Sequence, residues 1–516
     1  MPQTICGTVR VAGAAMQARL CGRGYAGAAQ LTRDDGRGTS DGVSQHVLTF
    51  DIGTSSVKAG VFDRADGSPQ WLHREPLASD RADLWVTERW IRALQATMDQ
   101  CPSRQAIGAI AFSGNGPTII PVAEDGTALH DALLWHDRRE IARAGHQSFF
   151  LPKVDWFRSH EPNAYERTWQ FMTCPEYLAY LFSGVSHSTS PSPEFDRYVW
   201  DAEGVAAYGL DAARLPPLVR PGDRVGLTDT RCRELFGLPT GIPVLAGGPD
   251  YLMGLLGTDV IQPGTTCDRA GTSEGINHCL AHPTPSPDVR CLPHVVPGLW
   301  NIAGVLSSTG RIFEWFRRIS RQRSVGYERM LAEIDAAGFE EEPFFFPSMH
   351  RGAAWEFSRG MFVGLRSDHG PAEMGRGVVH SIGYAVRQSI ESLRAAGCDV
   401  SELRSCGGQA KNPVWNQMKA DITGIPVTCP AILDAELVGS FCCALAGLGD
   451  HPTPWNAAER VVRFPERYEP SADRHARFTA GYSTYLSMYE RFLAVLHPPR
   501  DPGPEVAEQT AADCFE

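Results

Sequence analysis

In each half of the chain, short apolar patterns typical of buried strands alternate with longer amphipathic patterns typical of helices. Residues 47–52 and 57–62, joined by a turn of glycine and hydroxyl residues, predict a β-hairpin. Further strands are predicted at 106–112, 119–122, 242–246, 403–406 and 425–429, and helices at 85–98, 169–182 (restarting at Pro175), 251–256, 378–396, 413–423 and 435–448. No repeat of the kind that builds a solenoid is present. The alternation therefore predicts two α/β domains.

The two ends of the chain differ from the rest in composition. Residues 1–45 are rich in glycine, alanine and arginine and predict a disordered or spurious N-terminal extension, with an arginine-rich targeting peptide as the alternative. Residues 497–516 hold four prolines and several acids and predict a flexible tail. Regular structure is therefore expected only between these segments.

Charge and cysteine content exclude several classes of protein. The net charge of -12 argues against a sequence-independent nucleic-acid binder, which needs clustered basic charge. No apolar run approaches the roughly 20 residues that cross a bilayer, so we expect no membrane span. The 14 cysteines form neither a CxxC pair nor a cluster at zinc spacing, which favours reduced thiols and a cytoplasmic protein.

The segment from Asp51 to Lys58 carries the most specific chemical signal. An acid at a strand end is followed by the turn Gly53-Thr54-Ser55-Ser56 and a returning strand. Backbone N–H groups and hydroxyls of such a turn can hold a phosphate, while the acid holds a hydrated Mg²⁺. The alternative is an ordinary hairpin with an aspartate at its rim.

Three other loops have a similar setting, each with a purely structural alternative. Asp250 follows Gly247-Gly248-Pro249 at a strand end, where it is either a functional acid or a helix N-cap. Residues 271–273 (Gly-Thr-Ser) predict a second phosphate loop between two apolar stretches. Residues 407–412 lie between a strand and a helix, where bare backbone can meet a phosphate or a flat ring, or simply form a tight turn.

Several common catalytic motifs are missing or misplaced. The chain contains no GxxxxGK[ST] phosphate loop and no HExxH metal motif. Its one GxGxxG, at 22–27, follows no predicted strand, so it does not indicate a dinucleotide-binding domain. Of two GxSxG patterns, the one at 38–42 has neither the strand before it nor the helix after it that a hydrolase nucleophile elbow requires, and the one at 271–275 is followed by no clear helix.

Taken together and in order, these segments resemble the FGGY carbohydrate kinases, within the wider group that includes actin, hexokinase and the large heat-shock chaperones. The resemblance covers residues 47–496. The matching segments are Asp51-Ile52-Gly53-Thr54-Ser55 (first phosphate motif), Trp135-His136-Asp137-Arg138-Arg139 (W-x-D-x-R), Gly247-Gly248-Pro249-Asp250 (loop with the catalytic aspartate), Gly271-Thr272-Ser273 (second phosphate loop), Gly310 with Trp315 (nucleotide helix), and Gly407-Gly408 with Asn412, Trp415, Gln417, Ala420 and Asp421 (adenosine motif).

The resemblance implies an α/β fold with two ribonuclease-H-like domains of the actin/hexokinase type and a cleft between them. The expected limits are 46–262 for the sugar-binding domain and 263–496 for the nucleotide-binding domain. The implied reaction is phosphoryl transfer from ATP, with Mg²⁺, to a hydroxyl of a small sugar or polyol. The sequence leaves the oligomeric state open, with a homodimer as one option.

The resemblance also implies a role for each matched residue. Asp250 is the base that takes the hydroxyl proton, and Asp51 orients Mg²⁺ through water. The expected ATP-binding residues are Thr54, Ser55, Lys58, Gly271, Thr272, Ser273, Gly310, Gly407, Gly408, Ala410 and Asn412, and the expected substrate-binding residues are Asn115, Gly116, Pro117, Asp137 and Asp250. Two of these keep structural alternatives: Lys58 as a solvated strand lysine, and Asp137 as the ion-pair partner of Arg139.

Within the family the chain is most similar to the xylulokinase branch, but it departs where that branch reads its sugar. Xylulokinases usually carry S-G-Q-M-H-G, with the Met-His pair against the sugar, whereas this chain has Ser113-Gly114-Asn115-Gly116-Pro117-Thr118. Glycine and proline cannot supply those side-chain contacts. Kinases for glycerol, a tetritol or another ketose therefore remain open. An actin- or chaperone-type protein, driven by nucleotide without a sugar, is the alternative from another class.

Overall fold

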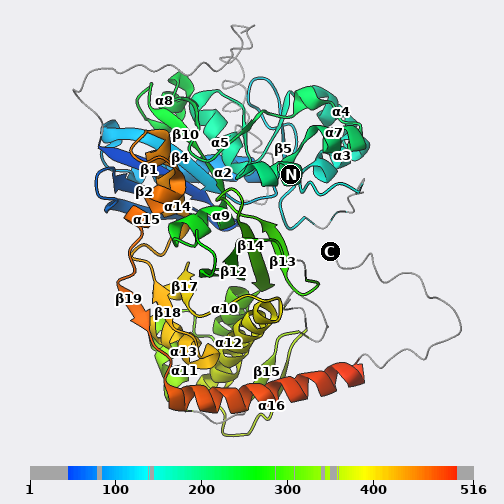
Figure 1. The fold of residues 1–516 in the computed structure, drawn as a ribbon, viewed down its shortest axis with the longest axis vertical. Helices are drawn as coiled ribbons and strands as arrows, with labels where there is room; N and C mark the ends of the chain where they lie inside the picture. The colour runs from blue at the N-terminus through cyan, green and yellow to red at the C-terminus, as the bar shows by residue number, and fades with distance from the viewer. Residues whose placement is uncertain are drawn as a thin grey trace, which may run out of the picture.

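The computed structural model describes residues 45–77, 84–137, 139, 145–284, 286–306, 308–338, 343–348, 357 and 359–496. The extension expected at the N-terminus, up to residue 44, and the tail expected at 497–516 lie outside these residues. The described chain forms two α/β domains, arranged along the long axis of the molecule (Figure 1).

The first domain is built on a mixed sheet of six strands in the order β3-β2-β1-β4-β10-β9. The predicted hairpin is confirmed as β1 (His46–Ile52) and β2 (Ser56–Asp63), and β3 (Pro69–Pro76) continues the antiparallel meander. On the other side of β1, β4 (Ile107–Gly114) and β10 (Pro243–Pro249) run parallel to it, and β9 (Arg224–Leu227) closes the edge. Because β1, β4 and β10 are parallel, the ends of these strands meet at one edge of the sheet.

The second domain repeats this plan with seven strands in the order β13-β14-β12-β11-β17-β18-β19. β11 (Thr266–Ala270), β12 (Glu274–Leu280), β14 (Trp300–Leu306) and β13 (Arg290–Pro293) form the antiparallel part. β17 (Leu403–Cys406) and β18 (Val427–Cys429) lie parallel to β11, and β19 (Glu466–Tyr468) ends the sheet. The repeated order confirms the two ribonuclease-H-like domains predicted from the sequence.

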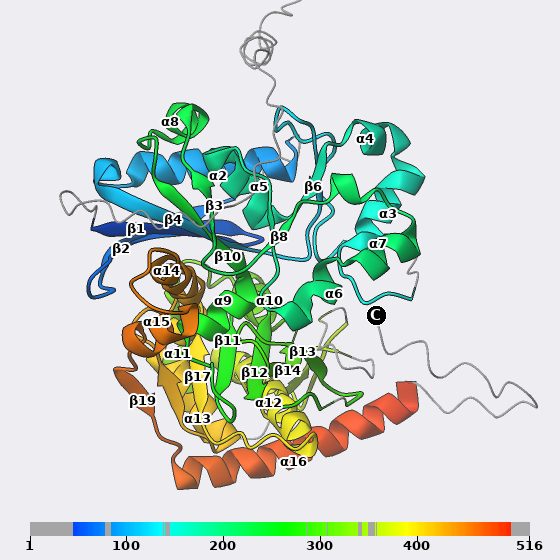
Figure 2. The same cartoon turned by 45° about the horizontal axis from the view of Figure 1, so that its top comes forward.

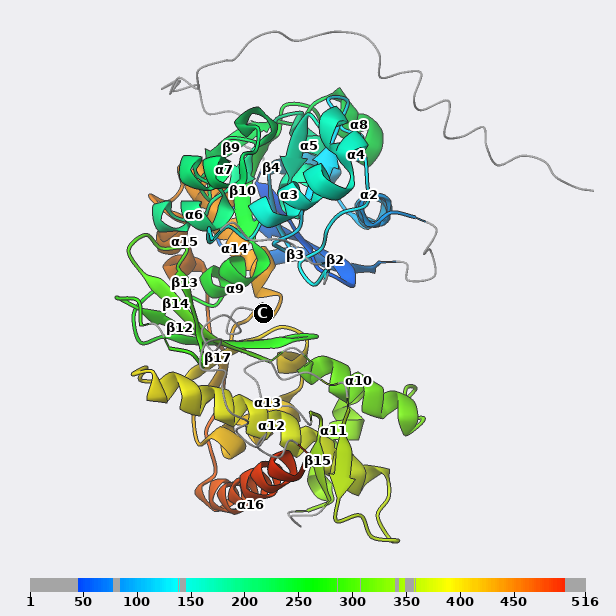
Figure 3. The ribbon, with the colours of Figure 1, turned by 90° about the vertical axis from the view of Figure 1, so that its right-hand side faces the viewer.

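Helices cover both sheets. The first domain holds α2 (Val86–Gln100), α3 (Leu151–His160), α4 (Pro162–Arg167), α5 (Cys174–Ser183), α6 (Asp196–Val199), α7 (Ala202–Tyr208), α8 (Thr230–Phe236) and α9 (Asp250–Gly257), with small strands β5 (Ile120–Val122), β6 (Gln170–Met172), β7 (Ser188–Thr189) and β8 (Leu218–Val219). Beyond it follow α10 (Thr309–Ile319), α11 (Tyr327–Ala336), α12 (Pro371–Ala395), α13 (Pro413–Thr423), α14 (Ala435–Gly447), α15 (Pro454–Val461) and α16 (Ala472–Leu496), with strands β15 (Phe344–Phe346) and β16 (Met361–Val363). The long helix α16 lies at the far end of the second domain (Figure 3).

Helices α9 and α14 lie between the two sheets (Figure 2). They approach closely because Gly439 has no side chain, since a Cβ there would lie 2.1 Å from the carbonyl oxygen of Met253. Helix α14 also packs on the first sheet, where Phe441 stacks on Phe62 of β2 at 5.1 Å between ring centroids. The chain therefore returns to the core of the first domain after building most of the second. The linear domain limits drawn from the sequence stay predictions.

One predicted element is wrong in part. Residues 170–172, expected to begin a helix, form the strand β6 and pair antiparallel with β5. The helix α5 begins only at Cys174, with Pro175 in its first turn, where proline needs no hydrogen-bond partner for its nitrogen. The apolar run continued through both elements, so its periodicity alone did not separate them. Helix α12 also begins earlier than expected, at Pro371.

Candidate active site

The first phosphate motif lies at the end of β1. Its turn is closed by a hydrogen bond from the backbone nitrogen of Gly53 to the carbonyl oxygen of Ser56, 3.0 Å away. The side chains of Thr54 and Ser55 are exposed, so their hydroxyls are free to meet a ligand. Asp51 is buried beside them and accepts a hydrogen bond from Ser113 Oγ of the neighbouring strand β4 at 3.2 Å. The phosphate role expected for this turn stays a prediction, which the exposed hydroxyls leave open.

Asp250 is the first residue of α9, where the chain leaves β10. Pro249 occupies the N-cap position, and the Oδ1 atom of Asp250 accepts a hydrogen bond from the backbone nitrogen of Tyr251 at 2.7 Å. The aspartate is therefore not the N-cap, although an acid in the first turn of a helix is favourable. Its other oxygen, Oδ2, lies 3.3 Å from Nη1 of Arg269 on β11. One carboxylate oxygen thus faces the second domain.

The second phosphate loop connects β11 to β12 and is held by two other predicted segments. A Cβ at Gly310, at the start of α10, would lie 2.3 Å from the carbonyl oxygen of Gly271, so only glycine allows the helix to approach the loop this closely. Gln409 Nε2 donates to the same carbonyl at 2.9 Å. The indole nitrogen of Trp415 donates in turn to Gln409 Oε1 at 3.2 Å. The sequence segments near 271, 310 and 409 therefore form one junction.

The adenosine motif follows β17. Gly407 is buried with φ of +89°, a conformation that favours glycine, and Gly408 is exposed. Ala410 is buried in the core, and the Oδ1 atom of Asn412 caps α13 by accepting from the backbone nitrogen of Trp415 at 3.1 Å. The carbonyl oxygen of Ala410 also accepts from Asn416 Nδ2 at 2.8 Å, and the side-chain oxygen of Asn412 is already in use.

Two acids that the sequence analysis missed connect these segments. Glu436, buried in the first turn of α14, lies 3.3 Å from Lys58 Nζ through Oε2 and 3.5 Å from Arg269 Nη1 through Oε1. Lys58 Nζ also lies 3.1 Å from Asp51 Oδ2. The chain of contacts therefore runs from Asp51 through Lys58, Glu436 and Arg269 to Asp250. We refer to these five residues as the charge chain.

Asp434 adds a branch toward the adenosine motif. Its Oδ1 atom lies 3.4 Å from Lys58 Nζ, and its Oδ2 atom lies 3.2 Å from Nζ of Lys411. The backbone nitrogen of Gly407 donates to the carbonyl oxygen of Leu433 at 2.8 Å. The hairpin of the first domain is thereby joined to the nucleotide segments of the second. The solvated-strand alternative for Lys58 is excluded, because this lysine contacts three carboxylates.

Burial and neighbouring charge set the electrostatics of the charge chain. The pKa of Asp51 is raised to about 6, mainly because the carboxyl is buried, with further contributions from the acids Glu436 and Asp250 against the lowering effect of Lys58. Burial acts on the pKa of Glu436 in the same direction, but Lys58 and Arg269 hold it below its ordinary value. Carboxylates outnumber cations here, which suits a site that receives a further cation.

The substrate stretch lies at the end of β4. Asn115 is buried, and its Nδ2 atom donates to the carbonyl oxygen of Ile52 at 3.0 Å while its Oδ1 atom accepts from Thr118 Oγ1 at 2.8 Å. This amide fastens the loop to β1, so little of it is left for a sugar. A Cβ at Gly116 meets no atom within 4 Å, and the following Pro117 is also only partly buried. The loop is open at these two residues.

The side-chain contacts of Asp137 lie within its own segment. Its Oδ1 atom accepts from the backbone nitrogen of Arg139 at 3.0 Å and lies 3.3 Å from that residue's Nε. The ion-pair alternative is therefore present in the structure. Buried Lys153 stands nearby with its pKa lowered to about 8, mainly by burial and against the opposing effect of Asp137. A sugar role for Asp137 stays a prediction.

A cation site made by the protein alone is not present in the described residues, where no group of three or more His, Cys, Asp or Glu side chains is placed to hold a metal ion. Magnesium, however, usually keeps several waters and takes one or two carboxylates together with substrate phosphates. Asp51, buried among excess acid beside an open phosphate turn, fits that mode of binding. The residues present therefore fit a magnesium nucleotide.

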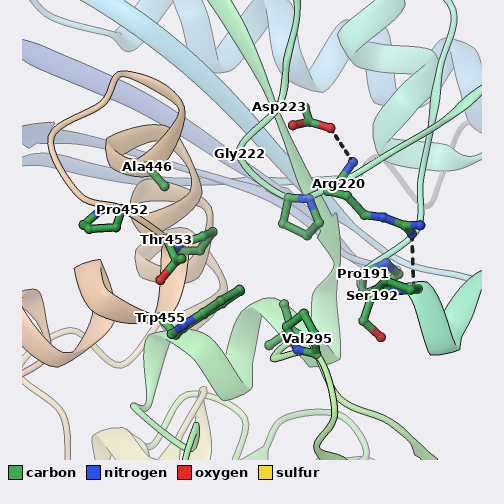
Figure 4. Close-up of a pocket in the computed structure, with 14 residues that line it drawn as sticks. Pro191, Ser192, Arg220, Gly222, Asp223, Val295, Ala446, Pro452, Thr453 and Trp455 are labelled. Atoms are coloured by element: carbon green, nitrogen blue, oxygen red, sulfur yellow. Dashed lines mark hydrogen bonds between the residues drawn. The ribbon is translucent and has the colours of Figure 1, made fainter.

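Two hollows lie apart from this site. One, of about 320 Å³, is lined by residues 191–193, 220–223, 295, 297, 446 and 452–455, and Figure 4 shows Arg220 bonded to Ser192 and Asp223 at its wall. The other, of about 380 Å³, is lined by apolar side chains around Trp315 and Phe345. Of the predicted segments, only Trp315 borders either hollow, so neither competes with the charge chain as the reaction site.

None of the helices in the described ranges is both long and apolar enough to span a membrane.

Comparison with known proteins gives concordant results. Residues 46–146 and 140–257 match the model of the FGGY family of carbohydrate kinases, N-terminal domain, and residues 269–448 match that of its C-terminal domain. A xylulose kinase of Staphylococcus epidermidis is 26% identical over 489 residues, covering 87% of this chain and 97% of that protein. An autoinducer-2 kinase of Escherichia coli is 23% identical over 507 residues, covering 87% and 95%.

A solved structure, the xylulose kinase from Rhodospirillum rubrum, superposes with a TM-score of 0.70 at 20% identity, covering 88% of this chain and 100% of that one. This likeness confirms the two-domain fold. The family matches favour a carbohydrate kinase over an actin- or chaperone-type protein, because both halves match kinase domains rather than only the phosphate loops.

Proposed function

The chain belongs to the FGGY family of carbohydrate kinases, and we propose that it phosphorylates a small sugar or polyol with ATP, using Asp250 as the base. The observation that carries this proposal is the charge chain. It joins Asp250 to Asp51 beside the first phosphate turn, and Arg269, which contacts Asp250, precedes the second phosphate loop by two residues. Phosphoryl transfer needs positioning and charge neutralisation rather than covalent chemistry by the protein. This arrangement supplies two positioned cations, and its excess of carboxylates suits the Mg²⁺ that would complete the neutralisation.

The reaction breaks the bond between the γ-phosphorus of ATP and the oxygen that bridges it to the β-phosphorus. A bond forms between that phosphorus and the substrate hydroxyl oxygen, the hydroxyl proton passes to Asp250, and ADP leaves. Because a sugar hydroxyl is a weak acid, the base acts as the new bond forms rather than before it. We assign the proton to the Oδ2 atom of Asp250, because Oδ1 already accepts from the backbone nitrogen of Tyr251 at 2.7 Å, whereas the contact of Oδ2 with Arg269 is longer, at 3.3 Å.

The remaining residues hold the nucleotide. We assign Thr54, Ser55 and residues 271–273 to the phosphates, and the junction of Gly310 with residues 407–412 to the adenosine. Asp51 would hold Mg²⁺ through water, and this ion, when bound, supplies neutralisation of the phosphate charge. Lys58 adds positive charge at the same place.

For the acceptor, we propose a substrate other than D-xylulose. Gly116 and Pro117 offer no side-chain hydrogen bond, and Asn115 is engaged within the protein. Loss of a hydrogen-bond partner for a sugar hydroxyl costs about 1 to 3 kcal/mol, which is one to two decades in affinity. The open space at Gly116 favours an acceptor with a different chain length or a less hydroxylated end, such as glycerol, a tetritol or another ketose.

The test is a panel of D-xylulose, D-ribulose, glycerol, erythritol and related compounds, assayed for acceptor-dependent ADP release and for the mass of the product. Acceptor-dependent ADP release with a phosphorylated product is the expected result. ATP hydrolysis that no acceptor accelerates would contradict the kinase assignment. A specificity constant for D-xylulose well above all others would contradict the substrate proposal alone.

We also place the protein in the cytoplasm. The eleven cysteines among the described residues are all free thiols, ten of them buried, as suits a reducing compartment. Fractionation of cells that produce the full chain tests this placement, with the enzyme expected in the cytosolic fraction. We propose a small-molecule acceptor and no nucleic-acid or membrane partner.

A further inference from the structure

Arg269 is an unusual residue for its position. It lies on β11, and the residue before it, Asp268, points to the opposite face, where it is fully buried against Lys419. Arg269 points to the same face as Gly271, at the start of the second phosphate loop. Its stem lies along α9, since a Cβ at Gly254 would be 3.2 Å from Arg269 Cδ. The guanidinium is thereby directed toward Asp250.

The contacts of Arg269 leave most of its hydrogen-bonding capacity unused. Its Nη1 atom donates to Asp250 Oδ2 at 3.3 Å and also lies 3.5 Å from Glu436 Oε1. Within the described part of the chain, Nη2 donates to no acceptor. Arginine frequently engages a carboxylate with two nitrogens in parallel. Here one edge of the guanidinium is held and the other is left for a ligand.

Glu436 holds a second cation, Lys58, opposite Arg269. One of its oxygens contacts Lys58 of the first domain, and the other contacts Arg269 of the second. The two cations are therefore held on either side of one buried carboxylate, between the two aspartates. A phosphoryl group that passes from ATP to a hydroxyl at Asp250 must cross this region, and its equatorial oxygens carry the charge that such cations stabilise.

We propose that Arg269 is a further catalytic residue, which contacts the phosphoryl group during its transfer. Glu436 is a positioning residue, whose two carboxylate oxygens hold Lys58 and Arg269 in place. The assignment rests on the proposed kinase function. In the transfer step, Arg269 donates hydrogen bonds to phosphoryl oxygens while the phosphorus–oxygen bonds exchange and the proton passes to Asp250. Arg269 itself neither gains nor loses a proton.

The experiment compares Arg269→Ala and Arg269→Gln with Arg404→Ala in the full chain. Arg404 is a matched control, because it lies on the adjacent strand β17 and contacts an acid, Asp259, at 3.1 Å. Its side chain is partly buried, as that of Arg269 is, but it lies outside the charge chain. ATP, Mg²⁺ and an acceptor that the wild type phosphorylates are the probes. The readouts are kcat, the KM of each substrate, and kcat with added guanidinium ion.

Loss of one preorganised donor to the transition state lowers kcat about 10²- to 10³-fold. We expect that loss in both Arg269 variants, with both KM values within about three-fold of the wild type. Guanidinium should restore Arg269→Ala at least ten-fold, because it replaces the missing group. Arg404→Ala should keep more than half of the wild-type kcat. Glu436→Gln should lower kcat without guanidinium rescue, since its effect passes through two placed cations.

The inference stands only if an Arg269 variant loses at least ten-fold in kcat and guanidinium relieves the loss in Arg269→Ala. A smaller loss, a loss that guanidinium does not change, or an equal loss in Arg404→Ala overturns it. If Arg269→Ala does not fold, the inference is decided by the kcat of Arg269→Gln against Arg404→Gln. A wild type with no acceptor-dependent ADP release overturns the proposed function instead, so the two failures are distinct.

Discussion

Replacing Lys419 by methionine should destabilise the second domain strongly. Lys419 lies on α13, fully buried, and contacts two buried acids, Asp268 of β11 and Glu274 of β12, the latter at 2.7 Å. The pKa of Glu274 is raised to about 8, mainly by burial, partly by Asp268, and against the effect of Lys419. At pH 7 the neutral form of Glu274 therefore dominates, and the lysine and Asp268 balance each other. Methionine keeps the length of the side chain but removes its positive charge.

The loss of unfolding free energy in Lys419→Met depends on how Asp268 responds when the lysine is removed. Without the lysine, this acid avoids a buried unpaired charge by binding a proton, although an aspartate in the unfolded chain is ionised above a pKa of about 4. At pH 7 that proton costs about 4 kcal/mol of unfolding free energy, since one pKa unit is about 1.4 kcal/mol. The value agrees with the roughly 3 to 5 kcal/mol seen when one partner of a buried ion pair is removed. At pH 5 the same deficit should shrink to about 1 kcal/mol.

The assay is urea-induced unfolding at pH 7 and pH 5, followed by tryptophan fluorescence. Lys419→Met with Asp268→Asn should recover most of the loss, because the charge is then removed with its partner. Arg329→Met, which breaks an exposed pair with Glu333 on α11, serves as the control and should cost less than about 1 kcal/mol. A Lys419→Met deficit below about 1 kcal/mol at pH 7, or equal deficits at the two pH values, would refute the reasoning.

Three further predictions concern pH, packing and the chain end. Burial raises the pKa of Glu176 to about 7. The contribution of this group to the free energy of unfolding is therefore fully present below about pH 4.5 and is lost as pH rises through 7. Glu176→Gln should remove this decline, which is worth about 3 kcal/mol, when unfolding is measured from pH 4 to 8. Gly310→Ala should raise the KM for ATP by ten-fold or more with an unchanged circular dichroism spectrum, because the new Cβ displaces the loop at Gly271; an unaltered KM would contradict this. A protein that starts at Ser44 should keep the melting temperature and activity of the full chain, and a clear drop in either would show that the extension docks on the core.

Local patterns predicted most elements near the site, because their causes are local. The strand at 403–406 and the helix at 413–423 have the predicted limits, since Gly407 and Gly424 end them and Asn412 with Pro413 begins the helix. The boundary between β6 and α5 was missed because the apolar run continues through both. Pairing of β6 with β5, some 50 residues earlier in the chain, is a tertiary effect that no local window contains.

The positions of the two loops expected to hold phosphate could be predicted from the sequence, but the residues that join them could not. Glu436 and Arg269 are far apart in the sequence, and an acid in the first turn of a helix is ordinarily explained by the helix dipole. One signal was available: the strand at 266–270 carries adjacent Asp268 and Arg269 between apolar neighbours. Charges in a buried strand need partners, so that pair could have indicated ionic contacts on both faces of the sheet. Their identity required the fold.

The central claim is that Asp250 directs the γ-phosphoryl group of ATP to an acceptor hydroxyl. The most direct test follows ATP labelled in its γ-phosphate through a single turnover with the best acceptor, for the wild type and for Asp250→Asn. We expect the label in the phosphorylated acceptor with the wild type, and a transfer rate lower by about 10²- to 10⁴-fold in the variant, with ATP binding nearly unchanged. Wild-type label that appears only as inorganic phosphate, or a variant that keeps more than a tenth of the transfer rate, would contradict the account.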